Sequence, residues 1–150
     1  MRISAKVDYA IRAMTELAAD GATVKGDHLA EAQRIPLNFL ENILAELRRA
    51  GIVGSQRGAD GGYRLQRPAD QISVADVIRA VEGPLASVRG MRPGTIVYQG
   101  SAEPLAEVWI AVRAALRSVL EGVTLADLAG GTLPAAIVGL AARPDAREPH

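Results

Sequence analysis

The chain has 150 residues, of which 49% are hydrophobic and only 3% aromatic, a composition that favours one mainly α-helical globular protein. No apolar run approaches the roughly 20 residues of a membrane span, and the amino terminus lacks a secretory signal pattern, so we expect a cytoplasmic protein. Cysteine is absent and the histidines, His28 and His150, are far apart, which excludes thiolate chemistry and predicts neither metal nor cofactor. Net charge is zero, but residues 1–67 carry ten Lys and Arg against eight Asp and Glu.

Three helices are predicted before residue 50. Apolar residues recur at helical spacing across residues 3–17, and Asp20-Gly21 ends this first helix. A shorter helix is predicted over residues 26–33. The third begins at Pro36, where a missing N–H costs nothing. Its expected buried stripe is Phe39, Leu40, Ile43, Leu44 and Leu47.

A short hairpin with a glycine-rich tip follows the third helix. Ile52-Val53 and Tyr63-Arg64-Leu65 are predicted to pair as strands around the turn at residues 57–62, whose sequence is RGADGG. The glycines permit the positive φ angles that a tight turn needs. Tyr63, like Phe39, is expected in the core. Short helices followed by such a hairpin indicate a winged helix-turn-helix.

The second half of the chain contains two capping boxes and one long helix. Ser73 to Asp76 opens a helix that Gly83-Pro84 ends, and Thr124 to Asp127 opens another capped turn. Residues 85–104 predict a loop or linker with a short strand at 95–98. From Leu105 a wide apolar stripe predicts a helix that suits packing against a second subunit.

Four regions are therefore expected. Residues 1–84 form a winged helix-turn-helix DNA-binding domain, and residues 85–104 form a loop. Residues 105–129 hold a dimerisation helix and a short carboxy-terminal helix, and residues 130–150 form a flexible tail whose last dozen residues are disordered. The fold class is mainly α with a small β-hairpin wing.

Base-reading residues can be predicted from the motif. In a winged helix-turn-helix the second motif helix enters the major groove and the wing reaches phosphates or the minor groove. Asn38 can pair with adenine, Glu41 can accept from cytosine, and Arg57 suits a narrow minor groove. The full set of DNA-binding candidates is Pro36, Leu37, Asn38, Glu41, Arg57 and, as phosphate contacts, Arg48, Arg49 and Arg64. Alternatively, Asn38 and Glu41 form an exposed helix face, and Arg48-Arg49 complement the helix dipole.

Several motifs together resemble one family. They are Asp8-Tyr9-Ala10, the segments 40–51, 57–65 and 77–83, and further along the chain Trp109 and segment 124–128. With these motifs the chain resembles the Rrf-two family of bacterial transcriptional regulators, which includes the iron-sulfur assembly, nitric-oxide-sensitive and cysteine metabolism repressors. The resemblance implies a homodimer with crossing long helices, a roughly palindromic operator, and base reading by Asn38, Glu41 and Arg57. Pro36 stands where the family often has serine, so operator preference is not carried over.

The loop from Arg89 to Glu103 departs from the cluster-binding members of this family, which carry cysteines there. Without thiolates an iron-sulfur cluster lacks its usual ligands, so sensing must differ or be missing. Arg89, Arg92, Tyr98 and Trp109 could surround a pocket for an anionic or aromatic effector. A solvated loop beside a packed tryptophan is the alternative.

Two classes of function follow. The first is a dimeric, sequence-specific DNA-binding regulator, expected to be a repressor independent of iron-sulfur clusters and controlled by a small molecule, by a partner protein or by its own abundance. The second is a winged-helix protein-interaction module that docks on an enzyme or regulator, which the zero net charge leaves open. An enzyme is not expected, because no catalytic residues can be named from paired carboxylates, a phosphate loop or a nucleophile with its base.

Overall fold

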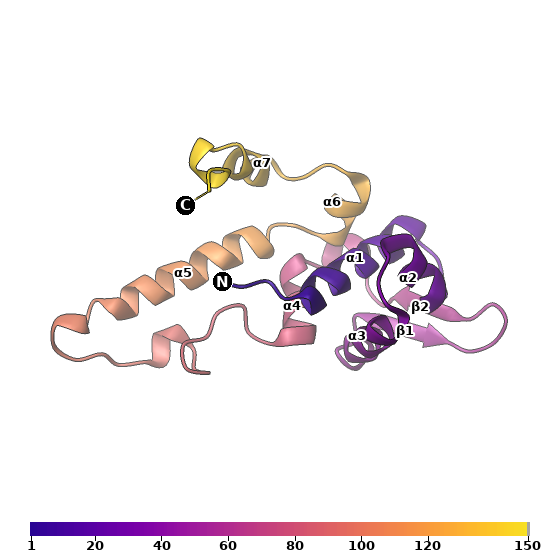
Figure 1. Cartoon of the computed structure of the whole chain (residues 1–150), viewed down its shortest axis with the longest axis horizontal. Coiled ribbons are helices and arrows are strands. Elements are labelled where there is room, and N and C mark those ends of the chain that lie inside the picture. Colours follow the sequence, from indigo (N-terminus) through magenta and orange to yellow (C-terminus); the bar gives the residue numbers. More distant parts are fainter. Residues whose placement is uncertain (150) are drawn as a thin grey trace.

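The computed structural model describes residues 1–149. Helix α1 (Ala5–Asp20) lies within the group of helices and strands at one end of the molecule (Figure 1). The Ser4 side chain accepts a hydrogen bond from the backbone N–H of Val7, and Gly21, at φ 72°, ends the helix. α1 contacts four other helices, α2 (Gly26–Gln33), α3 (Leu37–Arg49), α4 (Val74–Glu82) and α6 (Leu125–Gly130). It is therefore the common packing partner of the winged-helix unit.

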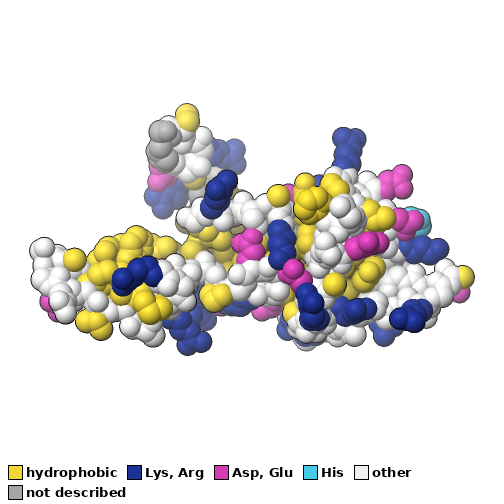
Figure 2. Space-filling view, turned by 60° about the horizontal axis from the view of Figure 1, so that its bottom comes forward, with side chains coloured by type: hydrophobic (Ala, Val, Ile, Leu, Met, Phe, Trp, Pro, Cys, Tyr) yellow, Lys and Arg dark blue, Asp and Glu magenta, His cyan; other side chains and the backbone are white. Residues whose placement is uncertain are grey.

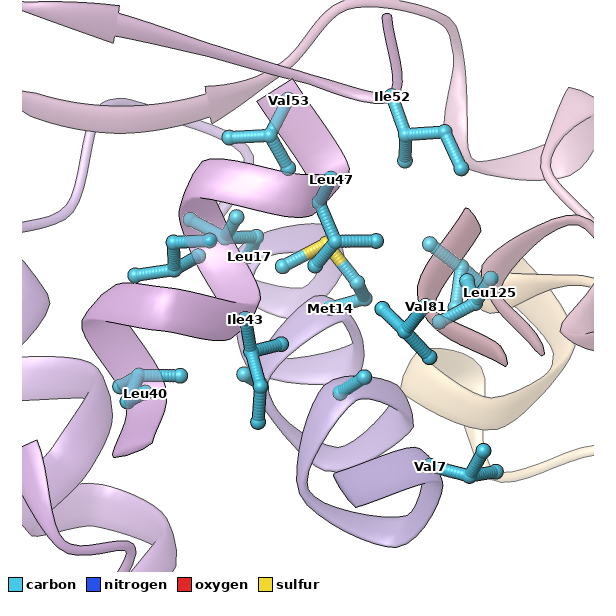
Figure 3. Close-up of a cluster of buried hydrophobic side chains, with 14 of the residues drawn as sticks. Val7, Met14, Leu17, Leu40, Ile43, Leu47, Ile52, Val53, Val81 and Leu125 are labelled. Carbon is cyan, nitrogen blue, oxygen red and sulfur yellow. The ribbon is translucent and has the colours of Figure 1, made fainter. Parts of the chain in front are cut away.

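The core lies where α1, α3, α4 and α6 meet (Figure 3). Met14 of α1, Leu40 and Leu47 of α3 and Leu125 of α6 are completely buried. Burying each such side chain contributes about 1.5–3 kcal/mol. Because α3 contributes Leu40, Ile43, Leu44 and Leu47 to this core, its orientation is fixed by packing rather than by its own helical propensity.

The two predicted capping boxes are confirmed, and the helices they open lie next to each other. Ser73 and Asp76 exchange side chain to backbone hydrogen bonds at the start of α4, and Thr124 and Asp127 do so at the start of α6. An antiparallel bridge joins the two caps, with the Val74 N–H donating to the Val123 carbonyl at 2.9 Å. This contact anchors the chain after α5 to the winged-helix unit.

Strand β1 (Val53–Gln56) pairs antiparallel with β2 (Gly62–Leu65). The pairing begins one residue later than Ile52, which is buried in the core. A loop containing the short 3-10 turns Pro93–Thr95 and Gly100–Ala102 leads outward from α4, and α5 (Leu105–Leu120) runs back beside it toward α6 (Figure 1). The fold class is confirmed as mainly α-helical with a hairpin wing. Within residues 1–149, no helix combines the length and apolar character needed to cross a bilayer.

Three predicted features are wrong. The strand at residues 95–98 is absent from the described chain, because Pro93 starts a 3-10 turn and no neighbouring strand offers hydrogen bonds. Residues 130–150 are not a uniformly flexible tail, since α7 (Ala135–Ala141) and a 3-10 turn at Pro144–Ala146 form there; His150 lies outside the described residues. Phe39 is not buried.

Phe39 exposes 59% of its surface although it precedes the buried Leu40. Its helical neighbours three and seven residues on are Asn42 and Glu46, which are polar, whereas those of Leu40 are Ile43 and Leu47. Phe39 therefore belongs to the outer face of α3. Tyr63 is half-buried and packs against the core from the hairpin.

Candidate nucleic-acid interface

The turn between α2 and α3 presents the start of α3 to solvent. Arg34 adopts a left-handed conformation at φ 52° and ends α2, while buried Ile35 donates a 2.8 Å hydrogen bond to the Ala30 carbonyl. Pro36 is the N-cap of α3. With Ile35 anchored in the core, the first turn of α3 projects outward.

The outer face of α3 carries the helix residues predicted to read bases. Pro36, Leu37, Asn38 and Glu41 are all exposed, and Leu37 and Phe39 add apolar surface beside them. Asn42 is also exposed and lies one turn after Asn38, on the same side of the helix. The sequence analysis does not include Phe39 and Asn42 among the candidate DNA contacts. The spacing of four residues between Asn38 and Asn42 would have placed both asparagines on one helix face.

The wing is fixed at its base by a third extended segment. Val24 and Tyr63 exchange backbone hydrogen bonds of 2.8 and 2.7 Å, so the segment before α2 pairs with β2. This close approach requires Gly62, where an added Cβ would lie 2.4 Å from the Val24 carbonyl oxygen. The Tyr63 ring packs over Gly26, 3.3 Å from the position of a Cβ there. Backbone hydrogen bonds thus hold the hairpin to the segment just before α2.

Arginines occupy the wing and the end of α3. Arg57 is exposed at the hairpin tip, and Arg64 is exposed on β2. Arg48 donates a 3.0 Å hydrogen bond to Ser55 Oγ on β1, which links the end of α3 to the wing, while Arg49 is exposed beside it. Figure 2 shows several basic side chains in a row on this half of the molecule. The helix start and the wing can therefore face one negatively charged partner together.

The four residues proposed for an effector pocket do not share one cavity. Arg89 and Trp109 line a cavity of about 560 Å³ between the amino terminus, the loop after α4 and α5. Arg92 lines a separate, smaller cavity, and Tyr98 lines neither of these two. Trp109 is half-buried, and its Nε1–H is buried without a hydrogen-bond partner among the described residues.

The loop residues do not fit an iron-sulfur cluster. The sequence contains no cysteine to supply thiolates, and residues 1–149 bring no three His, Asp or Glu side chains together as alternative ligands. In this respect the loop differs from the cluster-binding members of the family that the sequence resembles.

Comparison with known proteins agrees with this geometry. The sequence profile of the Rrf2 family, described as an iron-dependent transcriptional regulator, matches residues 3–131. Rv1287 of Mycobacterium tuberculosis (strain ATCC 25618 / H37Rv), a provisionally assigned HTH-type transcriptional regulator, is 54% identical over 143 residues, covering 94% of this chain and 89% of that protein.

Solved structures support the same assignment. The structure of CymR, the global cysteine regulator of B. subtilis, superposes with a TM-score of 0.75 at 34% identity, covering 88% of this chain and 98% of that one. T. potens IscR superposes with a TM-score of 0.66 at 30% identity, covering 100% and 93%. The chain therefore belongs to the Rrf2 family and is a DNA-binding transcriptional regulator.

Proposed function

We propose that this regulator acts as a homodimeric repressor in the cytoplasm, binding a roughly palindromic operator without an iron-sulfur cluster. The observation that carries the proposal is the joint exposure of the first turn of α3 and of Arg57, which lies on a wing anchored to the segment before α2. A helix start and a wing on one face match the two contacts that a winged helix-turn-helix makes with duplex DNA.

The dimer is supported by the surface of α5. This helix of 16 residues buries none of them fully, and its Val108 and Val112 expose 50% and 42% of their surface. An exposed apolar stripe on a projecting helix is costly in water and suits pairing with an equivalent helix. A two-fold dimer would place two copies of α3 on successive turns of DNA, which accounts for a palindromic site.

The proposed roles divide between reading and positioning. Asn38 and Glu41 read base edges in the major groove, with Pro36 and Leu37 in apolar contact beside them, and Arg57 enters the minor groove. Arg48, Arg49 and Arg64 neutralise phosphates and contribute salt-dependent affinity. Arg48 has the most restricted position, since Ser55 already accepts its hydrogen bond.

Sequencing the genomic DNA fragments that the purified chain selects tests this proposal. An inverted repeat should emerge, and Asn38→Ala should lower its affinity about tenfold and relax preference at one position in each half-site. Arg57→Ala should lower operator affinity, because it removes the proposed minor-groove contact beside each half-site. Arg143→Ala, a matched change at an exposed arginine paired with Asp145, should leave operator affinity unchanged. Failure to enrich any sequence at near-physiological salt would refute the proposed operator.

A further inference from the structure

A pocket of about 360 Å³ lies between the end of α4, the following loop and α5. Four arginines line it: Arg79 from α4, Arg92 from the loop, and Arg113 and Arg117 from α5. The remaining described lining residues are Gly83, Pro84, Leu85 and Ala86, so the lining that the structure describes contains no acidic side chain. The volume falls within the range of small-molecule sites.

The charges around this pocket are incompletely balanced. Arg79 and Arg117 both hydrogen-bond to one carboxylate, that of Glu121, and the distance from Arg117 Nε to Glu121 Oε1 is 2.9 Å. Arg79 also lies 3.7 Å from Asp76. Within residues 1–149, neither Arg92 nor Arg113 has an ion-pair partner or a side-chain hydrogen-bond acceptor. Glu121 thus orients two guanidinium groups and leaves two others with all their donors free.

This arrangement is unfavourable for the protein alone. Arg113 and Arg117 are four residues apart on α5, a spacing at which like charges destabilise a helix by a few tenths of a kcal/mol. Arg79 and Arg92 add further positive charge to the same concave site, where the potential is concentrated. A negatively charged ligand would remove this repulsion.

The position of the pocket separates it from the two proposed interfaces. None of the residues that line the pocket in the described chain belongs to α3 or to the hairpin. The exposed Val108 and Val112 lie about 140° around α5 from Arg113 and Arg117, respectively, given ~100° per residue. The arginines therefore flank the apolar stripe rather than forming part of it. Figure 2 shows basic side chains below the hydrophobic surface of this half of the molecule.

We propose that the arginine pocket binds a compact anion with two or more negative charges, either a phosphate ester or diphosphate or a small polycarboxylate. Arg92 and Arg113 supply free donors, Arg79 and Arg117 supply those not used by Glu121, and Leu85 forms part of the apolar wall. Bound here, the anion would bridge α4, which packs in the winged-helix unit, to α5. This site does not depend on the operator proposed above.

Calorimetric titration of the full chain with pyrophosphate, and separately with citrate, tests the proposal. Sodium chloride at equal ionic strength is the blank. Pyrophosphate or citrate should give a saturable binding heat and raise the melting temperature of the chain. The anion that binds with the higher affinity shows whether the pocket prefers phosphate or carboxylate groups. Arg92→Gln and Arg113→Gln should each weaken binding about tenfold, because each removes charge-assisted hydrogen bonds. Neither substitution removes a side-chain hydrogen bond or ion pair found within residues 1–149, so folding should be retained.

Arg89→Gln is the matched control, since Arg89 is an exposed arginine of the same loop that lines the neighbouring cavity instead. It should bind the anions as the unaltered chain does. The proposal is overturned if chloride stabilises equally, or if only Arg89→Gln loses binding. It is also overturned if Arg92→Gln or Arg113→Gln dissociates a dimer or weakens duplex DNA binding without added anion, because the arginines would then serve a subunit or phosphate contact.

Discussion

Phe39 is a large apolar side chain that the fold leaves uncovered beside Asn38 and Glu41, so its contribution should be to DNA contact rather than to stability. We predict that Phe39→Ala changes the free energy of unfolding by less than about 0.5 kcal/mol. Operator affinity should fall about tenfold, because an aromatic ring there can contact thymine methyl groups. Urea titration and fluorescence anisotropy with a selected DNA fragment measure the two quantities.

Leu40→Ala is the natural control, because Leu40 is fully buried one residue further on. It should cost about 2–5 kcal/mol of stability through the cavity it leaves. Should Phe39→Ala destabilise the chain as strongly as Leu40→Ala, the exposed position of Phe39 would be wrong.

Gly62 is the residue on which the wing anchor depends. A Cβ at this position would lie 2.4 Å from the Val24 oxygen, and the backbone φ of 146° is unfavourable for other residues. Gly62→Ala should therefore cost about 2 kcal/mol and also weaken DNA binding, because the hairpin that carries Arg57 would shift. Gly139→Ala, where an added Cβ meets no atom within 4 Å, should leave the urea midpoint unchanged or slightly higher. Equal midpoints for the two variants would argue against a close Val24 to Gly62 contact.

At the scale of elements, a single carboxylate joins α4 to the end of α5. The hydrogen bond from Arg117, followed by that from Arg79, lowers the pKa of Glu121 from an ordinary value of 4.5 to about 2. Because the folded pKa is the depressed one, the stabilisation is complete above the unfolded pKa and is lost as pH falls from about 4.5 toward 2. Glu121→Gln should be less stable near neutrality and should lose less stability across that acid range.

Urea midpoints measured between pH 2 and 7 for both chains test this expectation. Curves that run parallel through the acid range would show that Glu121 is not the titrating group. The effect should be modest, since the Glu121 side chain is about one third exposed and its ion pairs are screened by solvent and salt.

Elements were predictable where local signals agreed with each other. The capping boxes that begin at Ser73 and Thr124 each predict where a helix starts and how its first turn is capped, and both helices form as predicted. The segment 95–98 has β-forming residues but no partner strand, a fact that depends on the tertiary structure. The sequence predicts no helix at α7, because Gly130-Gly131 and the Pro-, Arg- and Ala-containing segment after them indicate a poorly anchored end.

The same distinction between local and tertiary information applies to the functional residues. The family, the fold and a DNA-binding function follow from contiguous motifs and are confirmed, whereas contacts by Asn38, Glu41 and Arg57 stay predictions. The arginine pocket could not be predicted, because Arg79 and Arg117 are brought together only by the packing of α4 beside α5. No sequence spacing connects residues so far apart in the chain.

At the scale of the whole molecule, α5 links the proposed dimer to DNA binding. Val112 lies in the middle of α5 on its exposed apolar stripe, so Val112→Glu would place a charge in the seam between two copies. We expect this variant to be monomeric in light scattering at micromolar concentration, because an unpaired buried charge costs several kcal/mol.

Each monomer would keep its own α3 and wing, so the variant should retain weak, salt-dependent binding to duplex DNA. It should lose most of its preference for the inverted repeat, because two unlinked monomers bind the two half-sites independently and gain no avidity. Ala114→Glu introduces the same charge on the side of α5 away from Val112 and should leave both the mass and the operator affinity unchanged. If Val112→Glu remains dimeric, the subunits pair through a surface other than the α5 stripe, and the spacing of the operator half-sites would then follow from that surface instead.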